Sequence, residues 1–177
     1  MEEKKKQTNR MCRERIVDAL VALLQEKPLS VISVSELTER AGVSRMTYYR
    51  NYSTKEEILT AYLEELVNAY REDAKDLPPE RAYFDRKNLI HCFTCFAKYR
   101  DFLDSLIYGG LGHYFLRAIN DYIMEQWFRP GDGAERYYTL QAFSGALFQV
   151  YLAWSANGAK ETPEQLSGIL YRIYISE

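Results

Sequence analysis

Arginine and lysine recur between residues 40 and 55 without an intervening acid. Arg40, Arg45, Arg50 and Lys55 fall in this stretch, and a nucleic-acid backbone requires local positive charge of this kind. Charge alone favours the simpler interpretation, a solvated helix face. The net charge of the whole chain, −2, does not decide between the two.

The residues around these cations have the pattern of a helix-turn-helix. Ser33 with Glu36 predicts the start of one short helix, and Ser44 predicts the start of a second. Between them lies Ala41-Gly42-Val43-Ser44, in which Gly42 permits a backbone reversal and its neighbours supply small contacts. An amphipathic helical hairpin with no DNA function has the same pattern, so the pattern leaves both open.

The second short helix carries the candidate DNA-reading side chains. They are Arg45, Thr47, Tyr49, Arg50 and Asn51. Arg50 can offer two N–H groups to guanine, Asn51 can pair with adenine or bridge to phosphate, and the Tyr49 hydroxyl suits a phosphate. Lys55 opens the next helix, where its ammonium and the helix dipole both favour an anion, so a phosphate contact is expected there.

Other groups with chemical potential give weaker signals. Cys92 and Cys95 lie three residues apart with His113 downstream, but no second cysteine pair completes four zinc ligands, so buried thiols are expected. Gly109-Gly110-Leu111-Gly112 lacks the strand and the lysine of a phosphate loop and predicts a helix bend. Two histidines cannot assemble a convincing triad. We therefore expect no catalytic residue, no metal, no cofactor and no enzyme.

Helical periodicity dominates the chain, and the expected fold class is all-α. A first helix is predicted from a Thr8 cap to Pro28, and the last two at about 134–157 and 163–175. We expect a helix-turn-helix domain at residues 1–54, a connecting helix at 55–76 that the Pro78-Pro79 break ends, and a C-terminal regulatory and dimerisation domain at 77–177.

Composition indicates a globular protein of the cytoplasm. Apolar residues make up 47% of the 177 residues, enough for a packed core, and the three cysteines are too few for a disulfide framework. No apolar run approaches the roughly 20 residues that cross a bilayer, and the charged N-terminus has no apolar stretch after it. We expect a cytoplasmic location and no membrane partner.

The run ISVSELTERAGVSRMTYYRNYSTKEEIL, residues 32–59, resembles the TetR family of transcriptional regulators. With the first helix, the resemblance covers about residues 8–63. It implies that Ser33 and Ser35 face the DNA backbone, and that Tyr49 and Lys55 contact phosphate. The remaining positions would lie at base edges or nearby phosphates; they are Arg45, Met46, Thr47, Arg50 and Asn51. Met46 and Asn51 depart from the family's frequent Gly and His, which alters those contacts without removing them.

Near the C-terminus, residues 154–166 are similar to a TetR subgroup that includes regulators of dihydroxyacetone kinase genes. The family implies a repressor of a palindromic double-stranded DNA operator, released when a small-molecule effector binds the C-terminal domain. An activator or coregulator acting through a protein partner stays open, as does a helical adaptor that never binds DNA. Tyrosines are frequent between Tyr83 and Tyr151, where plain packing is the simpler account. The candidate pocket residues are Tyr99, Phe102, Tyr108, Tyr114 and Tyr122.

The last two predicted helices carry broad apolar stripes that suit a homodimer. Two such terminal helices from each copy would form a four-helix interface across a two-fold axis. That dimer would set two reading helices about 34–36 Å apart, one DNA turn. The candidate interface residues are Phe143, Leu147, Val150, Tyr151, Trp154, Leu166, Ile169, Leu170 and Ile173.

Overall fold

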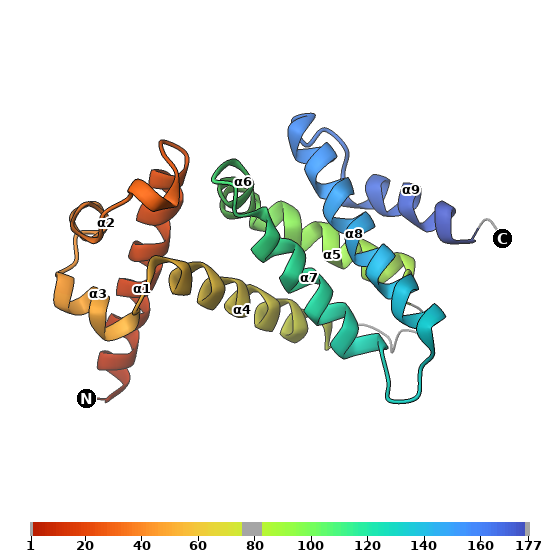
Figure 1. The fold of residues 1–177 in the computed structure, drawn as a ribbon, viewed down its shortest axis with the longest axis horizontal. Coiled ribbons are helices and arrows are strands. Elements are labelled where there is room, and N and C mark those ends of the chain that lie inside the picture. Colours follow the sequence, from red (N-terminus) through yellow and green to blue (C-terminus); the bar gives the residue numbers. More distant parts are fainter. Residues whose placement is uncertain (1, 76–82, 176–177) are drawn as a thin grey trace.

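The computed structural model describes residues 2–75 and 83–175, and within them the fold is all-α, as predicted. Two lobes lie side by side and α4 runs from one into the other (Figure 1). The first lobe contains α1 (Glu2–Leu24), the 3₁₀ turn η1 (Leu29–Val31), α2 (Val34–Ala41) and α3 (Arg45–Asn51). After α4 (Lys55–Ala74), the second lobe contains α5 (Arg86–Lys98), α6 (Arg100–Tyr108), α7 (Gly112–Trp127), α8 (Ala134–Ala156) and α9 (Pro163–Ile175).

Local capping sets the helix boundaries of the N-terminal lobe. The hydroxyls of Ser33, Ser44 and Thr54 each accept a hydrogen bond from the backbone N–H three residues later, which satisfies a donor that the helix leaves free. Gly42 ends α2 at φ 62°, a left-handed conformation that glycine adopts readily. The predicted Thr8 cap is wrong, because α1 begins at Glu2 and continues through Thr8. The residues before Thr8 are Glu, Lys and Gln, which favour helix.

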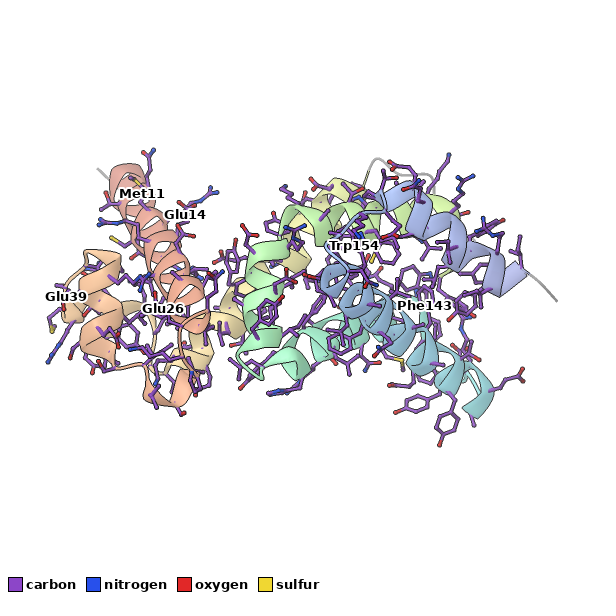
Figure 2. The ribbon with its side chains drawn as sticks, turned by 90° about the horizontal axis from the view of Figure 1, so that it is seen from above. Met11, Glu14, Glu26, Glu39, Phe143 and Trp154 are labelled. Atoms are coloured by element: carbon purple, nitrogen blue, oxygen red, sulfur yellow. The ribbon has the colours of Figure 1, made fainter. Side chains whose placement is uncertain are left out.

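Helices α4 and α6 join the two lobes. α4 packs on α1 at its start and on α5 and α7 further along, and α6 packs on α1. At Gly109, which follows α6, an added Cβ would lie 3.2 Å from Cδ2 of Leu24, so glycine permits this close approach. The view from above shows the same division, with Glu26 and Glu39 in one lobe and Phe143 and Trp154 in the other (Figure 2).

The connecting helix is described as far as Lys75, its C-cap. The predicted domain boundary at residues 76 and 77 and the Pro78-Pro79 break lie outside the described residues. No helix in the described part of the chain is long and apolar enough to cross a membrane.

The C-terminal core corrects the predicted dimer seam. α7 packs on α8, and α5 packs on α9. Six of the nine predicted interface residues are buried inside this one protomer: Phe143, Leu147, Tyr151, Trp154, Leu166 and Leu170. Their stripe faces the protomer's own core, because a lone amphipathic stripe carries no information about which neighbour covers it. Of the predicted set, Val150 is half-buried, and Ile169 and Ile173 are 47% and 65% exposed.

Candidate nucleic-acid interface and ligand cavity

The short helix α3 presents a polar outer face above a buried anchor. Tyr48 is only 1% exposed and fixes the helix against the N-terminal core, where its ring meets that of Tyr52. The residues on the other side are open: Arg45 and Arg50 are exposed, and Met46 and Tyr49 are 77% and 59% exposed. Since a long, unbranched Met46 reaches out beside the arginines, the surface offers both cationic and apolar contacts.

The predicted serine contacts lie on the same surface as α3, but both hydroxyls already have partners. Ser33 Oγ accepts from the Glu36 backbone N–H at 3.2 Å, which caps α2. Ser35 Oγ accepts from the Arg45 guanidinium, which links α2 to α3 across the turn. Arg50, by contrast, has no hydrogen bond or ion pair within the described part of the chain. Arg50 is therefore the cation on α3 that is freest to meet a base.

Asn51 and Lys55 have structural roles that differ from those predicted. Asn51 Nδ2 donates to the Thr47 carbonyl at 2.8 Å within α3, which holds the amide against its own helix. Lys55 Nζ donates to the carbonyls of Leu29 and Ile32 at 2.6 and 2.5 Å. The Lys55 ammonium thus fastens the start of α4 to the turn before α2, and since its third N–H has no partner in these two bonds, the phosphate contact stays a prediction.

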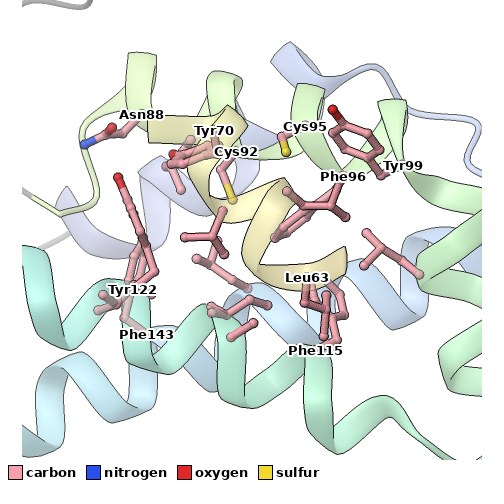
Figure 3. Close-up of a pocket in the computed structure, with 18 of the residues that line it drawn as sticks. Leu63, Tyr70, Asn88, Cys92, Cys95, Phe96, Tyr99, Phe115, Tyr122 and Phe143 are labelled. Atoms are coloured by element: carbon pink, nitrogen blue, oxygen red, sulfur yellow. The ribbon is translucent and has the colours of Figure 1, made fainter. Parts of the chain in front are cut away.

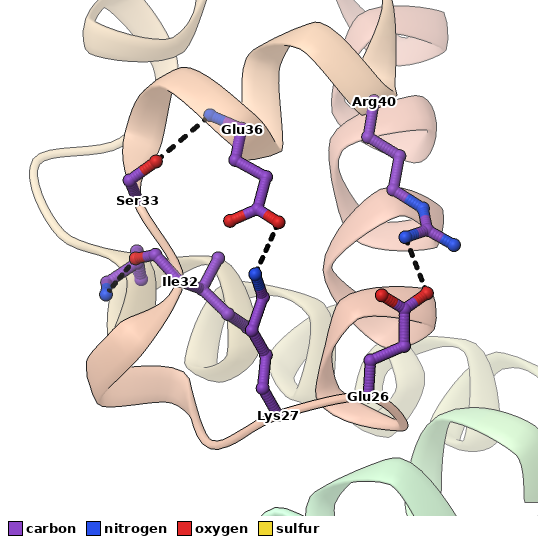
Figure 4. Close-up of polar contacts among 7 residues, drawn as sticks. Glu26, Lys27, Ile32, Ser33, Glu36 and Arg40 are labelled. Atoms are coloured by element: carbon purple, nitrogen blue, oxygen red, sulfur yellow. Dashed lines mark hydrogen bonds and ion pairs between the residues drawn. The ribbon is translucent and has the colours of Figure 1, made fainter.

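Ion pairs hold α2 against the end of α1 (Figure 4). Arg40 donates to Glu26 at 2.6 Å, and Lys27 pairs with Glu36. The Lys27 ammonium lowers the pKa of the Glu36 carboxyl below its usual value. Because Arg40 is paired with an acid, it adds less to the positive surface than its place in the sequence implies.

A cavity of about 90 Å³ lies in the C-terminal lobe (Figure 3). Helices α4, α5, α6, α7 and α8 all contribute to its lining, together with Tyr83. Of the five predicted pocket residues, Tyr99 and Tyr122 line it. The volume is well below the roughly 300–1,000 Å³ of drug-sized sites.

The other three predicted pocket residues lie elsewhere. Phe102 is buried against the Tyr62 ring, with the ring centroids 4.6 Å apart. Tyr108 is 73% exposed at the end of α6. Tyr114 lines a separate, more polar groove of about 480 Å³ between α4 and α7. Sequence alone did not separate these positions, because aromatic residues occupy core, surface and cavity alike.

Sequence reasoning missed Asn88 and the α4 side of the cavity. Leu63, Leu66, Val67 and Tyr70 of α4 line it, and their apolar stripe was the available signal. Asn88 lines it from the first turn of α5 and is 6% exposed. A signal existed here too, since Asn88 lies four residues before Cys92 and so shares its helix face.

The two cysteines of α5 face the same cavity and remain protonated thiols. Burial raises the pKa of Cys95 to about 11 and raises that of Cys92 as well. A thiol that is neutral at pH 7 is a poor metal ligand and a poor nucleophile. The described residues contain no cluster of three or more His, Cys, Asp or Glu that could hold a metal ion.

Comparison with known proteins decides the family of the N-terminal lobe. Residues 16–62 match the profile described as bacterial regulatory proteins, tetR family. A segment of 67 residues is also 37% identical to the HTH-type transcriptional regulator EthR of Mycobacterium tuberculosis. The N-terminal domain belongs to the TetR family. The EthR match covers 38% of this chain and 31% of EthR, about a third of that relative's length.

The whole chain has the fold of solved TetR-family regulators. A TetR transcriptional regulator from Streptococcus agalactiae aligns over 98% of both chains, with a TM-score of 0.66 and 21% identity. The dihydroxyacetone kinase operon activator DhaS aligns over 93% of this chain and 94% of its own, with a TM-score of 0.58 and 18% identity. The family is one of regulatory proteins, which agrees with the expectation that this chain is not an enzyme.

Proposed function

We propose that this protein is a transcriptional regulator that binds a DNA operator through α3. The observation that carries the proposal is the outer face of α3, where Arg50 is exposed and unpaired within the described residues while Tyr48 anchors the helix from behind. An exposed guanidinium on such a helix can bond two acceptors of guanine in the major groove. The TetR-family match over residues 16–62 supports the same placement.

The regulator acts as a homodimer in this proposal, through the outer faces of α8 and α9. Ala142, Gln149 and Ala153 are exposed on α8, and a Cβ at Gly145 would meet no atom within 4 Å. Ile169 and Ile173 are exposed on α9. Small residues allow two helices to approach closely, and exposed isoleucines supply apolar area that a second copy can bury. A two-fold dimer then requires an operator with two related half-sites.

Effector binding in the C-terminal cavity changes DNA affinity in this proposal, most simply by releasing a repressor. Support comes from α4, which lines the cavity through four residues and is continuous with the DNA-binding lobe. A ligand that needs more room than 90 Å³ must displace a wall helix, and a shifted α4 moves α3. The small volume also favours a second candidate, in which a protein partner takes the effector's place and the regulator activates or co-regulates.

Selection from random-sequence duplexes tests the DNA-binding proposal directly. The protein should enrich a sequence with two-fold symmetry, and log affinity for that sequence should fall linearly as log salt rises, because phosphate contacts release counterions. Failure to enrich any sequence, together with affinity that does not depend on salt, would favour the helical adaptor that never binds DNA.

A further inference from the structure

The C-terminal cavity is almost wholly apolar, with one polar group that has no partner. Its lining is made by aliphatic and aromatic side chains, the two thiols and the amide of Asn88. Asn88 is 94% buried, since only 6% of it is exposed, and its Nδ2 has no hydrogen-bond partner among the described residues. Buried donors are almost always paired in folded proteins, so this amide requires an explanation.

Asn88 lines the cavity from near the start of α5. It occupies the first turn of α5, where Asp85 Oδ1 already accepts from the Lys87 backbone N–H at 2.9 Å. In Figure 3, Asn88 and Tyr122 lie at one end of the lining and Phe96 and Phe115 lie at the other. The unpartnered amide of Asn88 thus belongs to one end of the cavity, and the other end contains Phe96 and Phe115 with Tyr99 and Cys95 beside them.

No charged side chain lines this cavity in the described structure. Three cations outside the lining contact its tyrosines: Lys98 lies 5.1 Å from the Tyr99 ring centroid, and two guanidinium groups are already engaged. Arg71 pairs with Glu125 and lies over the Tyr122 ring, 5.6 Å from its centroid. Arg136 lies 5.0 Å from the Tyr83 ring centroid and donates to the Trp127 carbonyl. A carboxylate or phosphate bound inside would be buried without a counter-charge, which is strongly unfavourable.

Size limits the occupant further. An apolar cavity of about 150 Å³ holds benzene, so a cavity of about 90 Å³ holds a somewhat smaller molecule unless a wall residue moves. Residues of α4 and α7 separate the cavity from the outer groove, because Leu63, Val67, Ala118 and Tyr122 line both. A somewhat larger ligand would have to displace these shared residues of α4 and α7.

We infer that the cavity binds a small, uncharged, mainly apolar molecule with one hydrogen-bond acceptor, such as a ketone, which accepts from Asn88 Nδ2. This inference rests on the proposal that the cavity is the effector site. Cyclobutanone, which is smaller than benzene, fits the description. Methylenecyclobutane has the same ring with a CH₂ in place of the oxygen, and cyclopropanecarboxylate is a charged molecule of similar size.

The test measures the affinity of these three probes for the DNA-free protein by NMR titration, in the wild type and in Asn88→Leu. The ratio of ketone to alkene affinity should fall about tenfold in the variant, the effect of one neutral hydrogen bond. Asn120→Leu is the matched control, since Asn120 also has an unpartnered buried amide atom but does not line the cavity. Its ratio should stay at the wild-type value.

A second measurement does not depend on any variant. Cyclobutanone should shift the side-chain NH₂ signals of Asn88 in the wild-type protein, and the carboxylate should leave them unchanged. An equal ratio in wild type and Asn88→Leu, tightest binding by the carboxylate, or no response to any probe would each overturn the inference. Because no DNA is present, these outcomes are distinguishable from a failure of operator binding.

Discussion

At the scale of single residues, the sequence predicted which side chains of α3 are exposed but not the hydrogen bonds that several predicted contact residues make within the protein. Ser33, Ser35 and Asn51 all lie near α3, yet each is hydrogen-bonded within the protein. Arg50 and Tyr49 are exposed as expected. The residue type determines which hydrogen bonds a side chain can make. The local backbone determines whether a group of the protein itself lies close enough to make them.

Lys55 provides the clearest residue-scale prediction. Lys55→Met should lower the free energy of unfolding by about 2 kcal/mol, because it removes two hydrogen bonds made by a charged group, those to Leu29 and Ile32. Urea denaturation measures this change. Lys160→Met, at an exposed lysine, should have little effect. The opposite result would be unchanged stability together with a slope of log affinity against log salt that is smaller by about one. That result would show that Lys55 contacts phosphate, as the sequence predicts.

At the scale of helices, prediction succeeded where the determinants are local. The starts of α2, α3 and α4 follow from Ser33, Ser44 and Thr54, whose hydroxyls bond backbone groups only three residues away. Which neighbour covers the apolar face of α8 depends on packing across the whole lobe. The sequence therefore predicts the stripe from Phe143 to Trp154, but the protomer's own core covers it and not a second copy. The volume of the cavity is similarly a property of several helices at once.

Helices α4 and α6 each contact both lobes, and each makes a polar contact with a neighbouring helix. Arg13 of α1 donates to the Tyr52 hydroxyl at 3.2 Å and pairs with Glu65 of α4. In the other lobe, Tyr151 of α8 donates to Asp104 Oδ1 of α6 at 2.7 Å. Since α6 also packs on α1, the Asp104 contact connects the C-terminal core with the DNA-binding lobe.

The contact between α6 and α8 predicts a specific pH dependence. Burial and the hydrogen bond to Asp104 raise the pKa of Tyr151 above its ordinary value of 10. The unfolded chain therefore releases the phenol proton first, and the stability from this group is complete below pH 10 and falls as pH rises above it. Tyr151→Phe should lose about 2 kcal/mol at pH 7, and its deficit relative to wild type should narrow above pH 10.

Chemical denaturation at pH 7, 9 and 10.5 measures this deficit. Tyr108→Phe serves as the control, because its ring is 73% exposed and it should match the wild type throughout. A Tyr151→Phe deficit that stayed constant across the series would show that Tyr151 titrates alike in the folded and unfolded chain.

At the scale of the whole molecule, the proposed dimer follows from what the protomer leaves uncovered. Substitutions at buried positions such as Leu147 would place a charge inside the protomer's own core and unfold it, so they cannot test assembly. Gly145 avoids that problem, because a side chain there meets no protomer atom within 4 Å of its Cβ.

Gly145→Leu should therefore abolish the dimer without harming the fold. The protomer should become more stable by about 0.5–1 kcal/mol, since glycine weakens a helix interior, while the larger side chain blocks close approach of a second α8. Sedimentation gives the mass and urea denaturation the stability. Ala97→Leu, exposed on α5, should remain dimeric. A fully dimeric Gly145→Leu protein would place the interface on another face.

The central claim is that α3 reads DNA through Arg50, and it is tested most directly by comparing operator binding of the wild type and Arg50→Ala. The selected operator and its single-base variants are titrated with both proteins at fixed salt, alongside Arg86→Ala, an exposed arginine of α5. Arg50→Ala should lose about 1–3 kcal/mol on the operator and stop discriminating at one base pair in each half-site. Unfolding should be unchanged, since Arg50 has no partner within the described residues. Undiminished affinity with the same sequence preference in Arg50→Ala would contradict the account.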